Sequence, residues 1–273
     1  MPKLKPWQIY GLPEPKSEAS KGELSLVDYE IYSGLEVPEG NFYFVRLDGW
    51  CFHRLVKEIK AKKPFDKNFA NSLAQASKQL MHVFDAKLCY CFSDEANFLF
   101  TKKPCFSRIE KIDSVFAGLF SGAFSWEIEK RFKKKKACVF DCRVIPLPKE
   151  KVIDYLIWRQ AECLRNHNNA YAQHVLEKSG IKPREVAKRL CGLKKQELFE
   201  LVKRHGINLN KTPVWHRNGF LLYKQKYKKQ GYNPITKKKV IVERRKIVID
   251  WKIPNFWSKE GKKFVGKILE DGI

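Results

Sequence analysis

The chain has 273 residues, of which 54 are Lys or Arg and 30 are Asp or Glu, so its formal net charge is +24 at pH 7. Apolar residues make up 44% of the chain and aromatic residues 13%, which excludes a largely disordered protein and predicts one elaborated domain or two. The charge excludes an acidic or neutral surface and favours a polyanionic partner, with nucleic acid or nucleotides first and an anionic membrane surface second.

Residues 1–24 predict an arm or extension, because they contain four prolines and no apolar periodicity. Asn41 to Leu47 is apolar on both alternating faces, which predicts a strand buried within a sheet and ending at Asp48-Gly49. Apolar residues at helical spacing predict helices from Phe52 to Ile59 and from Phe69 to Phe84.

The next segment predicts a hairpin, with strands at Leu88 to Phe92 and Asn97 to Phe100 and a short polar link that places Asp94 at a tight turn. A helix from Ile109 to Ala123 and a strand from Cys138 to Ile145 follow. These elements alternate without βαβ repeats. Residues 25–148 therefore predict an α+β catalytic domain, an antiparallel-rich sheet with helices packed on it.

Residues 149–210 predict a helical region. A long pattern from Lys149 to about Glu177 is followed by shorter helices, one from Pro183 to about Gly192 and one from about Lys194 to His205. In residues 211–273, the dipeptide Asn218-Gly219 predicts a hairpin turn, with strands continuing to Trp251.

Half of the excess charge lies in the last 63 residues, where 17 Lys and Arg face 5 Asp and Glu, a net charge of +12. Clusters such as Lys237, Lys238 and Lys239 alternate with aromatic residues, a mixture typical of surfaces that hold RNA. The alternative is a solvated hairpin that only keeps the protein soluble.

No apolar run reaches the roughly 18 residues of a membrane-spanning helix, and the first residues lack the apolar core of a secretory signal. We therefore expect a cytoplasmic protein with no membrane partner. The eight cysteines form no CxxC pair and lie mostly in apolar runs, which predicts free, buried thiols rather than a zinc site.

Two carboxylates indicate chemistry. Asp48 ends a central strand and Asp94 lies on an adjoining hairpin turn, so neighbouring strand ends would bring them within reach of one divalent ion. Mg²⁺ is typically held by one or two carboxylates, with substrate phosphates and water completing its shell. Either aspartate alone is more often only a turn residue.

The chain also resembles the tRNA-histidine guanylyltransferase family, from about Tyr29 to Tyr223. The resemblance is carried, in order, by FVRLDGWCFHRL, SDE, KKPFD, FDCRV, YLIWRQAEC, NHNNAY, RLCG, KQELF, HGIN and WHRNG. It implies a polymerase-like palm and 3'-to-5' nucleotide addition to the 5' end of tRNA. An incoming nucleotide's 3' hydroxyl would attack a 5' end that is adenylylated by ATP or is already a triphosphate, expelling AMP or pyrophosphate.

The resemblance also implies roles for residues at matching positions. Asp48, the carbonyl of Gly49, and Asp94 would bind two Mg²⁺ ions, with Glu95 as a third catalytic carboxylate. Substrate ATP, GTP or another nucleoside triphosphate would contact His53, Lys63, Asp66 and Ser93, and a second triphosphate would contact Arg108 and Lys111. The tRNA contacts would be Arg143, Arg159, Arg165, Asn168, Asn169 and Lys195, with Lys237, Lys238 and Lys239 of the basic tail.

Two departures from the family pattern affect the expected specificity. Trp50-Cys51 replaces a basic or polar pair, and Asn166 stands where eukaryotic members carry the His of a His-Ile-Asn-Asn run. We therefore expect the guanylyltransferase-like branch, archaeal, bacterial and organellar, which repairs truncated tRNA 5' ends against a template strand. A homodimer or homotetramer is expected from the resemblance.

Three alternatives remain open. The first is histidine-specific addition of guanosine at position −1 of tRNA, and the second is a non-catalytic tRNA-binding protein, which would not need the carboxylates. The third is a palm-type nucleotidyl cyclase, which would not need the basic tail.

Overall fold

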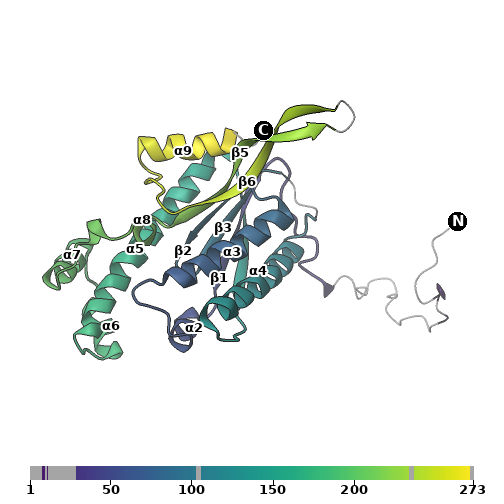
Figure 1. The fold of residues 1–273 in the computed structure, drawn as a ribbon. Coiled ribbons are helices and arrows are strands. Elements are labelled where there is room, and N and C mark those ends of the chain that lie inside the picture. The colour runs from purple at the N-terminus through teal and green to yellow at the C-terminus, as the bar shows by residue number, and fades with distance from the viewer. Residues whose placement is uncertain (1–7, 10, 12–28, 103–105, 234–236, 271–273) are drawn as a thin grey trace.

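The computed structural model describes residues 8, 9, 11, 29–102, 106–233 and 237–270 (Figure 1). The expected extension, residues 1–24, lies almost wholly outside the described residues. In the described part of the chain, no helix combines the length and the apolar character needed to cross a membrane.

One six-stranded sheet forms the centre of the molecule, in the order β4-β1-β3-β2-β5-β6. All neighbouring pairs are antiparallel. This confirms the α+β prediction. The strands are β1 (Phe42–Gly49), β2 (Leu88–Phe92), β3 (Glu95–Phe100), β4 (Phe140–Leu147), β5 (Phe220–Asn233) and β6 (Lys238–Asp250).

One face of the sheet is covered by α3 (Lys67–Phe84) and α4 (Ile109–Phe132), with the short α2 (Phe52–Glu58) at its end (Figure 1). The helical spacing of apolar residues explains why these segments fold as they do. The residues that meet the sheet, such as Leu73 and Leu80 on α3 and Phe116 and Phe120 on α4, have no exposed surface. They form the larger core cluster with alternate residues of the strands.

The opposite face is covered by the first half of α5 (Val152–Lys178) and by α9 (Lys259–Glu270), which pack on Phe44, Leu88 and Leu99. The second half of α5 leaves the sheet and makes a third cluster with two short helices, α6 (Pro183–Leu190) and α7 (Lys195–Arg204). Short 3₁₀ turns at Lys149–Lys151 and Leu209–Lys211 precede α5 and the helix α8 (Val214–Asn218).

The predicted hairpin turn at Asn218-Gly219 is wrong. Asn218 ends the short helix α8 (Val214–Asn218), and β5 begins at Phe220. Tertiary contacts decide this: the Asn218 carbonyl accepts hydrogen bonds from Tyr90 Oη at 2.8 Å and Gln160 Nε2 at 3.2 Å. A Cβ on Gly219 would lie 2.5 Å from the Cys91 carbonyl oxygen, so only glycine fits there.

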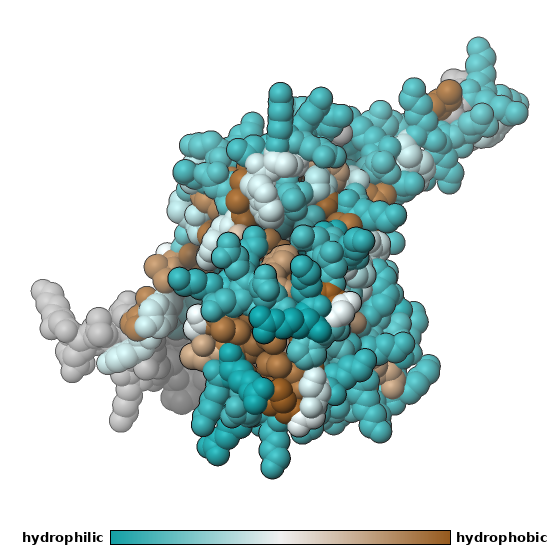
Figure 2. Space-filling view, turned by 90° about the vertical axis from the view of Figure 1, so that its left-hand side faces the viewer, coloured by the Kyte–Doolittle hydropathy of each residue, from teal (hydrophilic) through white to brown (hydrophobic). Residues whose placement is uncertain are grey.

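Strands β5 and β6 pair from Leu221 to Asn233 of β5, and β5 also pairs with β2 through Phe220 to Tyr223. Residues 211–273 therefore contribute two strands to the same sheet as the carboxylates. Beyond that pairing the two strands project from the body as an arm, whose surface is mostly hydrophilic but includes exposed hydrophobic residues such as Ile241 (Figures 1 and 2).

Candidate active site

Asp48 lies near the end of β1, on the face of the sheet that α5 covers. Alternation along β1 places Phe44, Arg46 and Asp48 on that face, and the first of them is buried in the core with α5. Asp48 is directly opposite Glu95 on β3 and Asp141 on β4. Directly opposed residues of antiparallel strands share a face, so three carboxylates meet across three strands.

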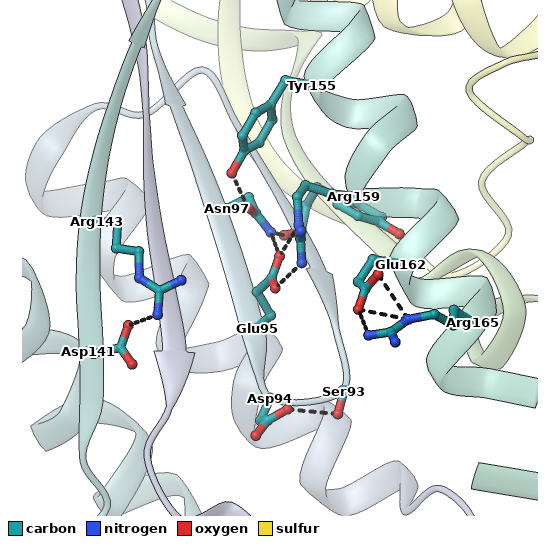
Figure 3. A network of polar contacts seen from close by, with 11 residues as sticks. Ser93, Asp94, Glu95, Asn97, Asp141, Arg143, Tyr155, Arg159, Glu162 and Arg165 are labelled. Carbon is teal, nitrogen blue, oxygen red and sulfur yellow. Dashed lines mark hydrogen bonds and ion pairs between the residues drawn. The ribbon is translucent and has the colours of Figure 1, made fainter. Parts of the chain in front are cut away.

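Asp94 lies in the two-residue turn between β2 and β3. Ser93 adopts a left-handed conformation, with φ of 50°, and its hydroxyl donates a hydrogen bond to Asp94 Oδ1 at 2.8 Å. Figure 3 shows this pair at the tip of the turn, apart from the contacts that Glu95 makes higher on the strand. The predicted hairpin is confirmed, with β3 beginning two residues earlier than expected.

The electrostatics of the two aspartates link them. The pKa of Asp94 is raised to about 6, mainly by burial and also by the negative charge of Asp48. The hydrogen bond from Ser93 acts in the opposite direction and lowers it. Partial burial, and then the charge of Asp141, raises the pKa of Asp48, while Arg46 and other arginines oppose the shift. Asp48 and Asp94 are therefore close enough to repel each other, and a cation between them would relieve that repulsion.

The residue types fit Mg²⁺, because carboxylate and backbone carbonyl oxygens are its preferred protein ligands. Gly49 follows Asp48 and cannot carry a side chain, since a Cβ there would lie 2.6 Å from the Phe52 ring. Among the described residues, no three His, Cys, Asp or Glu side chains form a complete metal site. An ion held by this pair would take its other ligands from substrate phosphates and water.

A cavity of about 410 Å³ opens beside Asp94. Its walls come from α2, the start of α3, the β2–β3 turn, the second half of α5 and α8. It brings together four residues predicted to bind the nucleotide, His53, Lys63, Asp66 and Ser93. Aromatic rings line part of the wall, including Phe65 and Trp215. A lining that combines polar side chains with aromatic rings suits a nucleoside phosphate.

Two of these lining residues already have protein partners. Asp66 is the N-cap of α3 and accepts hydrogen bonds from the backbone N–H groups of Asn68 at 2.7 Å and Phe69 at 3.2 Å. Lys63 Nζ lies 2.7 Å from Glu177 Oε2 in an ion pair between the cavity rim and α5. Asp66 thus shapes the cavity rim, and Lys63 would have to exchange its partner to reach a phosphate.

Glu95 makes contacts different from those expected of a catalytic carboxylate. Its oxygens accept hydrogen bonds from Arg159 Nε at 2.8 Å and Nη2 at 2.5 Å (Figure 3). Only 6% of the Glu95 side chain and 8% of that of Arg159 are exposed. Asn97 Nδ2 also donates to Glu95, and Tyr155 donates to Asn97. Glu95 therefore joins β3 to α5 instead of facing solvent beside Asp94.

The same contacts correct the expected role of Arg159, which is buried and paired and so is not accessible to tRNA. Asn168, also expected to contact tRNA, is buried, and its Oδ1 accepts a hydrogen bond from His167 Nδ1 at 2.9 Å. Burial lowers the pKa of His167 to about 4, so the ring is neutral in the core. Asn166 and Asn169, in contrast, line the cavity.

The other predicted contacts lie outside the cavity. Arg108 and Lys111 are at the start of α4, where Lys111 Nζ lies 5.2 Å from the centroid of the Phe106 ring. Arg143, Arg165 and Lys195 are on the surface, and the first two pair with Asp141 and Glu162.

Lys237, Lys238 and Lys239 are exposed at the far end of the β5–β6 arm. Residues 224–246 contain ten Lys or Arg and one acidic residue. Lys224 pairs with Asp85 and Lys226 with Glu243, and within the described residues no ion pair neutralises the arm's other cations. The arm is therefore a projecting positive surface.

Sequence reasoning missed Asp141 and His216. Asp141 meets Asp48 only through the pairing of β1 with β4, a register that no local pattern reveals. His216 lines the cavity, its Nδ1 lies 2.8 Å from Tyr171 Oη, and burial lowers its pKa to about 4. The motif WHRNG contains it, yet nothing in the motif shows that the ring faces a cavity.

Two sequence profiles match most of the chain. The profile described as tRNAHis guanylyltransferase matches residues 25–148, and the one described as the Thg1 C terminal domain matches residues 150–252. A Drosophila melanogaster relative is 33% identical over 67% of this chain. The matched region spans 66% of the relative's own length, just under two thirds. The tRNA(His) guanylyltransferase of Debaryomyces hansenii is 32% identical over 70% of this chain and 76% of its own.

Solved structures share the fold. A bacterial tRNA(HIS) guanylyltransferase (Thg1)-like protein in complex with ATP superposes with a TM-score of 0.70 and 25% identity, over 89% of this chain and 96% of that one. The tRNA(His) guanylyltransferase of Saccharomyces cerevisiae superposes with a TM-score of 0.63 and 26% identity, over 71% of this chain and 90% of that one. The palm-like sheet, the paired aspartates and both profiles agree, and the chain belongs to the tRNA-histidine guanylyltransferase family of nucleotidyltransferases.

Proposed function

We propose that this protein adds guanosine to the 5' end of tRNA-histidine. The observation that carries the proposal is the placement of Asp94 in the wall of a nucleotide-sized cavity, with Asp48 on the neighbouring strand opposite Glu95, the residue that follows Asp94. The names of the curated relatives support this reaction, which the sequence motifs indicated as an alternative, better than they support tRNA repair. The ATP complex of the bacterial relative supports a nucleotide substrate.

Mg²⁺ would be held by Asp48, Asp94 and the backbone carbonyl of Gly49. The family resemblance implies two such ions. Bound Mg²⁺ supplies positive charge that stabilises phosphoryl transfer and the leaving group. His53 and Ser93 would orient the base and phosphates of ATP or GTP in the cavity. The aromatic wall would exclude water from the reacting phosphate.

The β5–β6 arm would hold tRNA through its phosphates. Its unpaired cations are exposed, and Tyr227, with Lys246 Nζ 5.8 Å from its ring centroid, offers a stacking surface. Ionic contacts to phosphate position RNA without reading its sequence. Selection of the tRNA would therefore need contacts other than these phosphate contacts.

The test incubates the protein with a tRNA-histidine transcript lacking guanosine at −1, together with ATP, GTP and Mg²⁺. We expect a product one nucleotide longer, its loss on chelation of the metal, and its loss in Asp94→Asn. A folded wild-type protein that leaves the 5' end unchanged with every nucleoside triphosphate would overturn the proposal.

Template-dependent repair of tRNA 5' ends is the second candidate, favoured by one observation. Asn166, which stands in place of the His of eukaryotic relatives, lines the cavity. Losing a base-reading polar contact removes roughly 1–3 kcal/mol of discrimination, and pairing with the opposite strand would then select the nucleotide. The two candidates are separated with 5'-truncated tRNAs that carry the histidine anticodon or another anticodon, each made with all four templating bases. Addition of guanosine only to tRNA-histidine, whatever the opposing base, excludes repair.

A further inference from the structure

An exposed tryptophan, Trp50, follows the Asp48-Gly49 pair directly, and 64% of its side chain is accessible to solvent. Gly49 faces the core, because a Cβ there would lie 2.6 Å from the buried Phe52 ring. The backbone N–H of Trp50 donates a hydrogen bond to the Val139 carbonyl at 2.9 Å, which continues the β1–β4 register by one pair. Side chains alternate along a strand, so Trp50 lies on the same face as Asp48, about 7 Å further along.

The backbone at Trp50 is fixed on both sides. The hydrogen bond to β4 holds one side. On the other side, Cys51 adopts a left-handed conformation with φ of 57°, and its carbonyl accepts a hydrogen bond from the backbone N–H of Arg54 at 3.0 Å in the first turn of α2. Val139, opposite Trp50, is 48% exposed. An aromatic ring on a fixed backbone offers a surface on which a planar group stacks with little loss of conformational entropy.

A run of four lysines, Lys133 to Lys136, leads into β4 just before Val139. Lys136 Nζ lies 2.7 Å from Glu58 Oε2, and this ion pair ties the run to the end of α2. The other three lysines are exposed, and among the described residues none of them forms an ion pair. Lys135 is at most about 14 Å along the chain from Val139, since an extended residue spans about 3.6 Å. Unpaired positive charge therefore adjoins the exposed ring.

This surface is separate from the nucleotide cavity. Neither Trp50 nor the lysine run is part of the cavity wall, which Asp94 and His53 line. Cations beside an exposed aromatic ring are typical of surfaces that hold single-stranded nucleic acid, because the cations contact phosphates and the ring stacks on a base. Bases inside a duplex are already stacked, so such a ring selects an unpaired base.

We propose that Trp50 stacks on an unpaired base at the 3' end of the tRNA acceptor, and that Lys134 and Lys135 contact the phosphates of this overhang. The proposal rests on the proposed function for its RNA, a tRNA whose 5' end reaches Asp48 and Asp94. The strand opposite that 5' end continues past the duplex as unpaired nucleotides, which leave the duplex beside the carboxylates. Trp50 is about 7 Å from Asp48 along the strand direction, so the first unpaired bases lie within its reach.

The first test measures RNA binding in the absence of nucleoside triphosphates, so it does not depend on any reaction. Filter binding compares a tRNA-histidine transcript carrying its unpaired 3' nucleotides with the same transcript trimmed to the end of the duplex. Stacking of one base is worth about tenfold in affinity, so Trp50→Ala should bind the full transcript about tenfold more weakly than the wild type and the trimmed transcript equally well. Trp50→Phe keeps a ring and should retain most of the affinity.

Two controls accompany these variants. Trp257 is 42% exposed and lies outside this surface, so Trp257→Ala should bind both transcripts as the wild type does. Because Trp50 is mostly exposed, Trp50→Ala should also keep the wild-type melting temperature, measured by circular dichroism.

The lysines are tested through salt dependence. Each phosphate contact on a single strand contributes about 0.7 to the slope of log affinity against log salt, so the double variant Lys134→Ala with Lys135→Ala should reduce that slope by about 1.4 for the full transcript. The slope for the trimmed transcript should not change. Lys262→Ala with Lys263→Ala removes the same charge from exposed positions of α9 and should leave the preference for the full transcript intact.

Three results would overturn the proposal: a wild type that binds both transcripts alike, an equal loss of affinity for both in Trp50→Ala, or full affinity in that variant. The outcome is independent of catalysis. A protein that prefers the full transcript through Trp50 but adds no guanosine would refute the proposed function and support the stacking contact. A protein that adds guanosine but binds both transcripts alike would do the reverse.

Discussion

The buried ion pair between Glu95 and Arg159 allows the sharpest prediction of stability. Replacing Arg159 with leucine leaves the Glu95 carboxylate in the core with one remaining donor, the Asn97 amide. Removing one partner of a buried pair costs about 3–5 kcal/mol of unfolding free energy, because the other charge loses both water and its counter-ion. We expect the loss of unfolding free energy in Arg159→Leu to fall in that range.

The same helix supplies a matched control. Arg165 pairs with Glu162 on α5, but 66% of its side chain is exposed. An exposed pair of this kind is worth about 0–1 kcal/mol, so Arg165→Leu should cost less than about 1 kcal/mol. The double variant Glu95→Leu with Arg159→Leu removes both charges and should recover most of the loss, since Asn97 Nδ2 can still donate to the Tyr90 carbonyl.

Urea titrations monitored by circular dichroism give the unfolding free energies of the three variants and the wild type. Two results would refute this explanation. One is an equal loss of unfolding free energy in Arg159→Leu and Arg165→Leu, and the other is a double variant less stable than Arg159→Leu alone. The first outcome would mean that the pair is exposed in solution. The second would mean that packing around Glu95, and not its charge, carries the stability.

Three further outcomes follow from the site and the arm. Asp48→Ala and Asp94→Ala should each abolish nucleotide addition while tRNA affinity, measured by filter binding, stays within a few-fold of wild type. The pKa of Asp94 is raised to about 6 in the folded protein, so its contribution to stability is full below the unfolded value near 3.8 and is lost as the pH rises through about 6. In metal-free urea titrations, the unfolding free energy of the wild type should therefore fall over that pH interval relative to that of Asp94→Asn. Neutralising Lys237, Lys238 and Lys239 together should weaken tRNA binding and make its salt dependence shallower, whereas an unchanged salt slope would show that the three lysines do not contact phosphate.

Local patterns were sufficient for much of the fold. The apolar run ending at Asp48, the polar link around Asp94 and the helical spacing of α3 and α4 depend only on residues near one another in the chain. The sequence therefore placed Asp48 at a strand end and Asp94 on a hairpin turn correctly. It missed α9, because that helix is itself rich in charged residues and is defined by packing Val265 and Ile268 on the distant core of α5.

Tertiary structure decided the partners of the charged groups. Nothing local distinguishes Arg159, buried on Glu95, from Arg165, exposed one turn and a half later on the same helix. The register of β1 against β4 brings Asp141 to Asp48, and the packing of α8 on β2 turns Asn218-Gly219 into a helix end. The sequence by itself determined the elements and the residue types of the site, because backbone periodicity and turn chemistry act over a few residues. Which charges are buried, paired or left for a ligand depends on strand register and helix docking, and those are set by contacts between residues up to more than a hundred positions apart.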